Sequence, residues 1–420
     1  MMISDNRVDM KGRSPLYFCR MSTSDIKGGF ALDLSREIGR YGNELIRLRR
    51  HFHTNPELGF EEIQTAEYVA NYLTDLGLEV KTGLGRTGVT GTLRGKGSGR
   101  TLLLRSDMDA LPLQEETGLP FSSQNSGVMH ACGHDAHMAM LLITAKILKE
   151  HKDLIPGNIR FAFQPNEENA GAEEMIHDGV LKEPDVDAAM ALHLWSQLET
   201  GTAGLNAGPL MGASHHFFLT LYGNGGHGGM PSKATDLLLA ASRIILDVQQ
   251  IQTRDFDNLK PTIITFCSIS GGISPIVFPR ELSLKGSIRY LHEDSEEVEK
   301  RFEEYVAGIC SLTGCTYKLD IIVSNRLLSN DPGMTDMATG VLENIFGPQK
   351  ICRDMRMMVG EDFAEFARRV PSVFYFVGTG NKEKGTDHPH HSPLFNIDED
   401  SLPLGVECHL RNTFKFFEIP

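Results

Sequence analysis

The chain has 420 residues, of which 40% are hydrophobic and 23% charged, and its formal net charge at pH 7 is -14. This is ordinary globular composition, and the length suggests two or three domains that each bury a core. The acidic balance argues against a nucleic-acid partner, because phosphate binding requires basic surface. No apolar run has the length expected of a membrane span, so no membrane partner is expected either.

Cysteine usage and the N-terminus both favour a cytoplasmic protein. The seven cysteines are scattered, odd in number and not spaced like a disulfide framework, which indicates a reducing compartment. Residues 1–28 mix charge, Gly and Pro and contain no apolar core of the signal-peptide type. We expect this stretch to be disordered or an artefact of start choice, since Met10 and Met21 are alternative starts.

In the first half of the chain, apolar strands alternate with helical segments. Helices are expected at 32–53, 61–76 and 138–148, short strands at 78–80 and 88–93, and longer apolar strands at 101–104, 158–163 and 188–192. Polar residues follow each longer strand: Asp107 and Asp109, then Glu167 and Glu168, then His193. Because open α/β sheets bind ligands outside the carboxyl ends of their strands, these side chains should converge on one crevice.

The stretch His130-Ala131-Cys132-Gly133-His134-Asp135-Ala136-His137 brings a thiol, three imidazoles and a carboxylate together where a loop becomes a helix. Cys132 and His134, two apart at a rigid helix start, can point at one cation. The alternative is a set of satisfied or exposed polar groups around a buried cysteine, since a lone Cys-x-His is no zinc-finger signature. The converging strand ends favour the metal site.

From about residue 207 the pattern changes to β-α-β-β-α-β, the ferredoxin-like order. The expected elements are strands at 217–222, 262–268, 281–289 and 316–323 and helices at 236–251 and 295–312. We therefore predict an α/β protein with an inserted α+β domain at 208–324. Residues 29–207 and 325–420 should form the two parts of a catalytic domain with a mixed open sheet and flanking helices. The second part should contain helices at 334–346 and from 361, and a strand at 373–377.

The converging residues form a mixed sulfur, nitrogen and oxygen donor set: Cys132, His134, Glu168, His193 and a late histidine, either His390 or His391. Such a set suits Zn²⁺ or a similar transition ion, whereas Mg²⁺ and Ca²⁺ prefer oxygen ligands. Five ligands exceed one closed tetrahedral site, but a thiolate bridging two ions would use them all. Of the adjacent glutamates, one can bind metal while the other faces the water as general base.

A series of motifs extends from about Leu32 to the C-terminus. They are Arg49-Arg50-His51-Phe52-His53 with Pro56-Glu57, Asp107-Met108-Asp109-Ala110-Leu111-Pro112, the stretch from His130 to His137, Gln164-Pro165-Asn166-Glu167-Glu168, Ala191-Leu192-His193, Gly226-His227 with Pro231, Glu361-Asp362-Phe363 and His391-Ser392-Pro393. Together they resemble the aminoacylase-like metallopeptidases, in particular the amidohydrolase branch that holds hippurate hydrolases, N-acyl-amino-acid deacetylases and auxin-conjugate hydrolases.

The resemblance implies a zinc-peptidase-like fold and two divalent ions, either Zn, Mn, Ni or Co, bridged by Cys132. The remaining ligands would be His134, Glu168, His193 and His391. Glu167 would be the general base that deprotonates the water and hands the proton to the leaving amine. Asp109 matches the acid that orients a ligand in this family, although Asp107 is an equal geometric candidate. The spacing to Pro393 and Phe395 selects His391 over His390.

The resemblance also implies that the inserted domain is a lid and a homodimer interface. His227 resembles a lid histidine that stabilises the oxyanion, often in the partner's active site. Arg289 resembles an arginine that binds the substrate carboxylate. The alternatives are an incidental histidine in a Gly-rich turn and a solvated strand-end arginine. One position departs from the family: an Asn that helps to hold the substrate is Ile276 here, which indicates a more apolar substrate.

The predicted function is metal-dependent hydrolysis of the amide bond of N-acyl amino acids, which gives a carboxylic acid and a free amino acid. Two alternatives remain open. The first is a dipeptidase or carboxypeptidase on the same scaffold, and the second is a metal-holding binding protein without activity. The adjacent glutamates Glu167 and Glu168 argue against the second, because a binding protein needs no general base.

Overall fold

The computed structural model describes residues 32–257 and 259–419. The expected N-terminal extension, residues 1–28, lies outside this part of the chain. None of the described helices is both long and apolar enough to cross a membrane. Six cysteines lie in the described part, and all six are free thiols.

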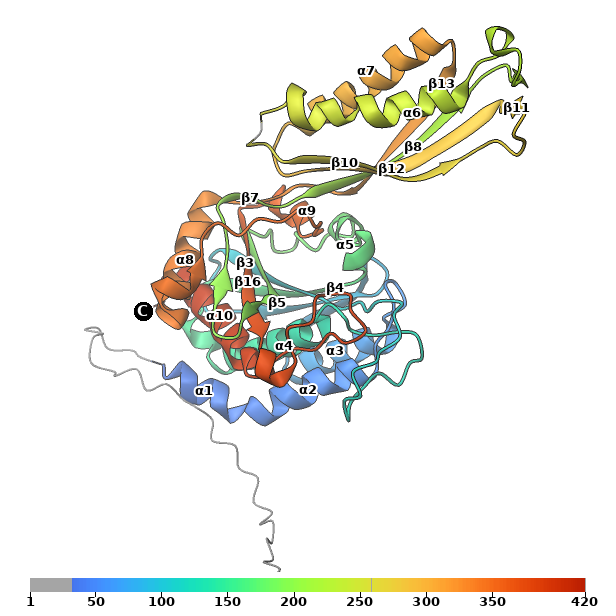
Figure 1. Ribbon diagram of the computed structural model, residues 1–420. Helices are drawn as coiled ribbons and strands as arrows, with labels where there is room; N and C mark the ends of the chain where they lie inside the picture. Colours follow the sequence, from blue (N-terminus) through green and yellow to red (C-terminus); the bar gives the residue numbers. More distant parts are fainter. Residues whose placement is uncertain (1–31, 258, 420) are drawn as a thin grey trace, which may run out of the picture. The chain divides into compact units, whose positions relative to one another are not determined.

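The larger sheet has eight strands in the order β1-β2-β4-β3-β5-β16-β6-β15 (Figure 1). In chain order these strands are β1 (Glu79–Leu84), β2 (Gly88–Arg94), β3 (Thr101–Asp107), β4 (Asn158–Gln164), β5 (Ala188–Glu199), β6 (Ala203–Gly204), β15 (Ile351–Cys352) and β16 (Ser372–Gly380). The sheet is mixed: β4, β3, β5 and β16 run parallel, whereas β1 and β2 add antiparallel strands at one edge. This is the mixed α/β sheet that the sequence predicts.

The central strands are buried on both faces. Every residue of β3, β4 and β16 is buried, which explains why their sequences read as continuous apolar runs without alternation. Because β3, β4 and β5 are parallel, their carboxyl ends lie at the same edge of the sheet. Asp107 and Glu167 are therefore brought to one edge, as expected. His193 was expected to follow a strand that ends at 192, but β5 continues to Glu199, so His193 lies inside the strand.

Helices cover this sheet. They are α1 (Leu34–Arg40), α2 (Gly42–Thr54), α3 (Ile63–Asp75), α4 (His134–Glu150), α5 (Ala172–His177), α8 (Pro332–Phe346), α9 (Ala364–Ala367) and α10 (Ser401–Phe416). Almost every residue of α4 is buried, because α4 packs on β3 while α2 and α10 pack on α4. On the other side, Phe363 and Phe366 join Leu103 and Phe374 in one apolar cluster.

The predicted first helix, residues 32–53, is in fact two helices that meet at Tyr41. The Tyr41 backbone N–H bonds to Gly39 and Ile38 instead of continuing the helical ladder, and Gly42 follows immediately. The Tyr41 hydroxyl also donates to Glu150 at the end of α4. The sequence pattern misses the break because apolar periodicity continues across it, whereas the cause is a tertiary contact beside flexible glycines.

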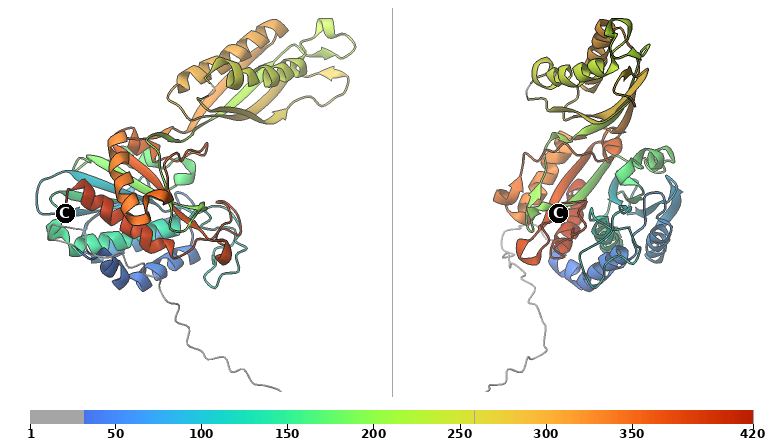
Figure 2. Two further views of the ribbon diagram at one scale, coloured as in Figure 1. Left: turned by 60° about the vertical axis from the view of Figure 1, so that its left-hand side comes forward. Right: turned by 45° about the vertical axis from the view of Figure 1, so that its right-hand side comes forward.

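The second sheet belongs to the expected insertion. Its four strands, β8 (Ala213–Tyr222), β10 (Thr262–Ser270), β12 (Glu281–Tyr290) and β13 (Thr316–Asn325), are antiparallel and lie in the order β10-β12-β8-β13. Helices α6 (Leu237–Asp247) and α7 (Ser295–Thr313) cover one face of this sheet (Figure 2). The chain order of these elements is the predicted β-α-β-β-α-β. The boundaries at 208 and 324 and the lid role remain predictions.

Two short strands pair where the chain enters and leaves this region. They are β7 (Gly208–Met211) and β14 (Leu328–Asn330), and they form an antiparallel ribbon. The region beyond the ribbon has its own apolar core, to which Phe217, Leu284 and Phe302 belong. An independent core is what an inserted domain requires.

Candidate metal centre

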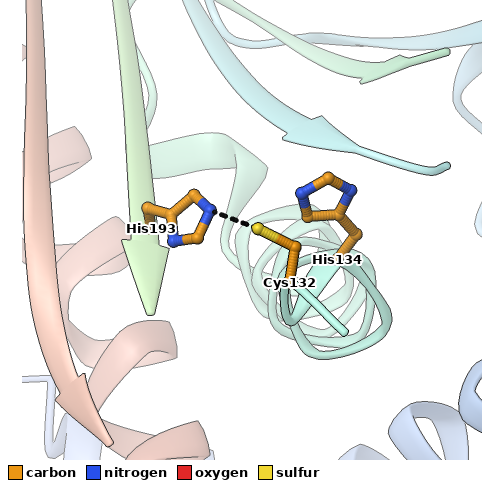
Figure 3. Close-up of side chains that lie close together, drawn as sticks. All are labelled: Cys132, His134 and His193. Carbon is orange, nitrogen blue, oxygen red and sulfur yellow. Dashed lines mark hydrogen bonds between the residues drawn. The ribbon is translucent and has the colours of Figure 1, made fainter. Parts of the chain in front are cut away.

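Cys132 and His134 lie at the start of α4, where Gly133 adopts a left-handed conformation with φ of 92°. A residue with a β-carbon rarely adopts this conformation, so Gly133 allows the sharp turn that separates the two donors. The turn directs Cys132 toward β5, where its Sγ lies 3.5 Å from Nε2 of His193 (Figure 3). His134 is the first residue of the helix, in agreement with its expected place at a helix start.

Donor atoms of the predicted ligands gather in overlapping groups. Within each group the atoms lie within 4.8 Å of one another, and the groups are Cys132 with His134 and His193, Cys132 with Glu168 and His391, and His134 with Glu167 and Glu168. All five predicted metal ligands therefore lie in one connected cluster. Cys132 belongs to two groups whose other members differ, which is the arrangement that a bridging thiolate needs.

A strained turn presents the two glutamates. Asn166 and Ala170, with φ of 53° and 63°, flank the 3-10 turn Glu167–Asn169. The Asn166 backbone N–H donates to the buried Glu62 carboxylate at 2.9 Å, which fixes the entry to the turn. Left-handed non-glycine residues cost free energy and persist where surrounding contacts hold them, as they do here.

Asp109 contacts two of the candidate ligands, whereas Asp107 makes its hydrogen bonds with Arg105 and His137. His134 Nδ1 lies 2.8 Å from the Asp109 carbonyl oxygen, and the Glu168 backbone N–H donates to the Asp109 carboxylate at 3.1 Å. The Asp107 carboxylate instead accepts from Arg105, at 2.7 Å, and pairs with His137, also at 2.7 Å. The Asp109 carbonyl oxygen thus holds Nδ1 of His134, while Nε2 of His134 lies 3.8 Å from the Asp107 carboxylate, and the role of Asp109 remains a prediction.

The two late histidines lie in different surroundings. His391 has a φ of 62°, and its Nε2 lies 3.1 Å from the Glu168 carboxylate. The His390 ring packs against Trp195, with ring centroids 4.3 Å apart. Of the pair, His391 is thus the one that reaches Cys132 and Glu168, as its spacing predicts.

Electrostatics in the cluster favour a positive charge beside Cys132 and Glu168. Hydrogen bonds to Cys132 and Glu168 raise the pKa of His391 to about 10. Burial and the nearby Glu168 carboxylate raise the pKa of the Cys132 thiol. Burial and the neighbouring imidazoles of His137 and His390 hold the pKa of His193 well below its usual range, so this ring is neutral. Neutral imidazole is the metal-binding form.

Glu167 is a buried carboxyl group with other carboxyl groups as its neighbours. Burial, followed by the charges of Glu361, Glu168 and Asp362, raises the pKa of Glu167 well above its usual range. Its Oε2 lies 3.9 Å from Nε2 of His134. The carboxylate therefore lies beside the candidate ligands and is poorly solvated, which strengthens it as a base.

The donor set fits divalent transition ions. Nε2 of His134 is buried and has no hydrogen-bond partner among the described residues, so a donor atom is left for another species. The thiol, imidazole and carboxylate donors together match zinc-like ions. The residues present thus fit the two ions that the sequence implies.

The remaining predicted site residues lie on the inserted region. His227 is exposed on the short strand β9 (Gly226–His227), where it pairs with Val277 of β11 (Val277–Phe278). Arg289, on β12, donates to the Met358 carbonyl oxygen at 3.0 Å. Within the described chain, neither residue makes a hydrogen bond or ion pair with the metal-ligand candidates, so their roles remain predictions.

One buried residue near the cluster, Arg105 on β3, was not among the residues predicted from the sequence. Arg105 is fully buried, and its guanidinium donates to groups on three segments: Gln164 at 2.9 Å, Asp107 at 2.7 Å, and Glu361 and Asp362 at 3.0 Å each. The sequence does indicate such a residue, because an arginine inside an apolar central strand must be paired with hydrogen-bond acceptors. The partners themselves could not be named without the fold.

A mixed α/β sheet with such a donor cluster at its carboxyl edge is typical of a metal-dependent hydrolase. The chain belongs to the peptidase family M20/M25/M40, whose model matches residues 103–413, and within it to the amidohydrolase branch. It is 36% identical over 389 residues to thermostable carboxypeptidase 2 of Saccharolobus solfataricus, covering 91% of this chain and 98% of that protein. It is 35% identical over 361 residues to N-acetyl-L-cysteine deacetylase of Bacillus subtilis, covering 86% and 85%.

Among solved structures, the fold is similar to that of the YXEP protein of Bacillus subtilis, which is described as a dinuclear metal-binding peptidase. The TM-score is 0.80 and the sequence identity 28%, over 91% of this chain and 99% of that one. The family and the fold thus agree with the hydrolase class that the sequence predicts.

Proposed function

We propose that this enzyme hydrolyses the amide bond of N-acyl amino acids at a centre of two divalent ions. The observation that carries the proposal is the position of Cys132, which shares one group of donors with His134 and His193 and another with Glu168 and His391. A relative that deacetylates N-acetyl-L-cysteine and a structural neighbour with a dinuclear centre support it.

The ions, either Zn, Mn, Ni or Co, would polarise the amide carbonyl and lower the pKa of a water molecule. Glu167, buried beside His134, would accept a proton from that water at a carboxylate oxygen and return it to the nitrogen of the leaving amino acid. Asp109 would keep Nε2 of His134 directed at the cluster, because it engages Nδ1 on the opposite side of the ring.

We assign His227 to support of the oxyanion and Arg289 to the substrate carboxylate. The support is the resemblance of their surroundings in sequence to the family motifs, together with their chemistry. An imidazole N–H can donate to a developing negative oxygen, and a guanidinium can bind both oxygens of a carboxylate at once.

A second candidate is a carboxypeptidase activity on the same centre, since the chain is 36% identical to a thermostable carboxypeptidase. The two activities share the metal centre and differ in the group on the acyl side of the bond. N-acetyl, N-benzoyl and long-chain N-acyl amino acids should be compared with N-blocked dipeptides under the same metal conditions.

Metal analysis of the purified protein should accompany this comparison. Two ions per chain and a higher kcat/KM for simple N-acyl amino acids than for blocked dipeptides would support the proposed function. Higher kcat/KM for the dipeptides would favour the carboxypeptidase. Protein that binds the ions and hydrolyses neither class would contradict both.

We further propose a cytoplasmic homodimer that associates through the inserted domain. Leu238, Leu239 and Leu246 are exposed on α6, and Ile263 and Ile269 are exposed on β10, the edge strand of the sheet among the described residues. Exposed apolar surface beside an open strand edge favours association. Leu246→Glu should convert the dimer to a monomer in light scattering, whereas Leu312→Glu, an equally exposed change on α7, should not.

A further inference from the structure

A chain of buried hydrogen bonds connects Arg105 to the part of β5 that carries His193. Arg105 donates to one oxygen of Asp107, the other oxygen of Asp107 lies 2.7 Å from Nδ1 of His137, and Nε2 of His137 lies 2.9 Å from the Leu194 backbone nitrogen. All three side chains are at most 2% exposed. At this depth, water does not compete for the hydrogen bonds of these side chains.

The direction of these bonds determines the state of His137. The Leu194 backbone N–H can only donate, so Nε2 of His137 accepts and carries no proton. The proton is therefore on Nδ1, which donates to Asp107. Both nitrogens are used, so His137 is not a free metal ligand, although it lies close to His134 and Asp107.

Leu194 is in turn the residue that orients the ring of His193. Nδ1 of His193 donates to the Leu194 carbonyl oxygen at 2.6 Å, which directs Nε2 of His193 to Cys132 Sγ, 3.5 Å away. The N–H of Leu194 is held by His137, and its carbonyl holds His193. Displacement of the Leu194 backbone would therefore turn the imidazole that faces the cluster.

We propose that His137 is a positioning residue that aligns His193 with Cys132 through the Leu194 backbone, and so sets the affinity for one of the two ions. The proposal rests on the two-ion centre proposed above. Groups that hold a metal-binding histidine in this way contribute about 10–100-fold to metal affinity. Arg105 and Asp107 fix the other side of the His137 ring.

Two amide variants of different length test the proposal. In His137→Gln the amide can still donate to Asp107 and accept from Leu194. In His137→Asn the amide can reach Asp107, but the shorter side chain leaves the Leu194 N–H unpaired. We expect His137→Asn to bind one ion about 10–100-fold more weakly than wild type, and His137→Gln to bind both ions normally.

Ion stoichiometry should be measured by elemental analysis after dialysis against metal buffers. Binding can also be followed by fluorescence, because Trp195 is the single tryptophan of the chain and its ring centroid lies 5.9 Å from that of His193. The thermal unfolding of the ion-free variants should match that of ion-free wild type, since a purely structural defect would appear there. His292→Asn makes the same substitution at a buried histidine in the inserted domain and should leave both affinities unchanged.

The outcomes separate this inference from the proposed function. Wild type that binds no ion contradicts the two-ion centre itself. Wild type and His137→Asn that bind two ions equally tightly contradict the inference alone, as does an equal loss of both ions in His137→Asn. If His137→Asn fails to fold, nitrogen NMR of wild-type histidines decides. His137 should keep a proton on Nδ1 with and without ions, and a metal-bound His137 would overturn the inference.

Discussion

Glu167 and Glu168 are neighbours in one turn and yet have different surroundings. The Glu168 carboxylate extends to His391, and the Glu168 backbone N–H donates to the Asp109 carboxylate, so Glu168 lies among the candidate ligands. Glu167 is 7% exposed and lies among other carboxylates and His134. The surroundings thus match the two roles proposed for this pair, one as a ligand and one as a base.

Glu167→Ala should reduce kcat by about 10²–10⁴-fold, the usual contribution of a general base. Its metal content should stay near that of wild type, because the five ligand candidates are intact. Steady-state kinetics and elemental analysis on the same preparation test this. The matched control is Glu174→Ala, which should retain activity. Glu174 is a half-buried carboxylate on α5 that pairs with Arg86. Retained turnover in Glu167→Ala would refute the assigned base.

Ile276 stands where the resemblance to the family implies an Asn. It is 62% exposed, and its carbonyl oxygen accepts from Gly228 beside His227, so it lies on the same ribbon as the proposed oxyanion donor. We expect Ile276→Asn to lower the preference for long-chain over acetyl substrates by about tenfold, since apolar contact of this size contributes ~1–3 kcal/mol. Ratios of kcat/KM measure the change. An equal effect of Ile273→Asn, at an exposed position in the loop before β11, would show that position 276 has no special role.

Helices α2 and α4 are joined by buried charges directly behind the metal-ligand candidates. Asp135, next to His134, accepts from Arg49 at 2.9 Å and pairs with His53 at 2.7 Å, and none of the three is more than 1% exposed. Arg49 also donates hydrogen bonds to Asn396 and Glu399, which follow His391 in the chain. The network therefore connects the start of α4 to the loop that carries the last ligand candidate.

Asp135→Ala should destabilise the protein by about 3–5 kcal/mol, because it leaves Nε of Arg49 and Nδ1 of His53 buried without the carboxylate that they share. Urea unfolding of the ion-free protein measures this without interference from metal binding. Asp153→Ala removes an exposed carboxylate after the same helix and should have little effect. If Asp135→Ala lowers the free energy of unfolding by less than 1 kcal/mol, the network does not hold α2 and α4 together.

The proposed centre draws its ligands from segments throughout the chain: the start of α4, the turn after β4, the strand β5 and the loop before α10. Ions bound there would stabilise the folded state of the whole catalytic region, because the unfolded chain cannot present these donors together. Removal of the ions should therefore affect stability as well as activity.

Chelation should abolish activity and lower the free energy of unfolding by about 2.7 kcal/mol for each ion that was present at a hundredfold excess over its Kd. Thermal unfolding with and without chelator measures the loss, and added Zn²⁺ or Mn²⁺ should reverse it. Cys132→Ala lacks the shared thiol, so chelator should change its unfolding little. An identical unfolding temperature for wild type with and without chelator would contradict a structural contribution of the ions.

Local pattern was sufficient for the longer strands and for the polar residues after β3 and β4, although it placed the end of β5 at 192 and missed short strands such as β6 and β15. Apolar runs and their terminators act over a few residues, so they can be recognised without knowledge of the rest of the chain. The same is true of the β-α-β-β-α-β order of the insertion. Motif spacing selected His391 over His390 as a ligand candidate, and the donor atom of His391 lies with those of Cys132 and Glu168.

Other features depended on contacts between distant segments, which no local pattern contains. The contact between His134 and the Asp109 carbonyl oxygen, the partners of Arg105 and the break at Tyr41 all follow from packing across the sheet and its helices. A buried charge must be paired, and sequence predicts that much. Which group pairs with it is decided only when the tertiary fold brings the two segments together.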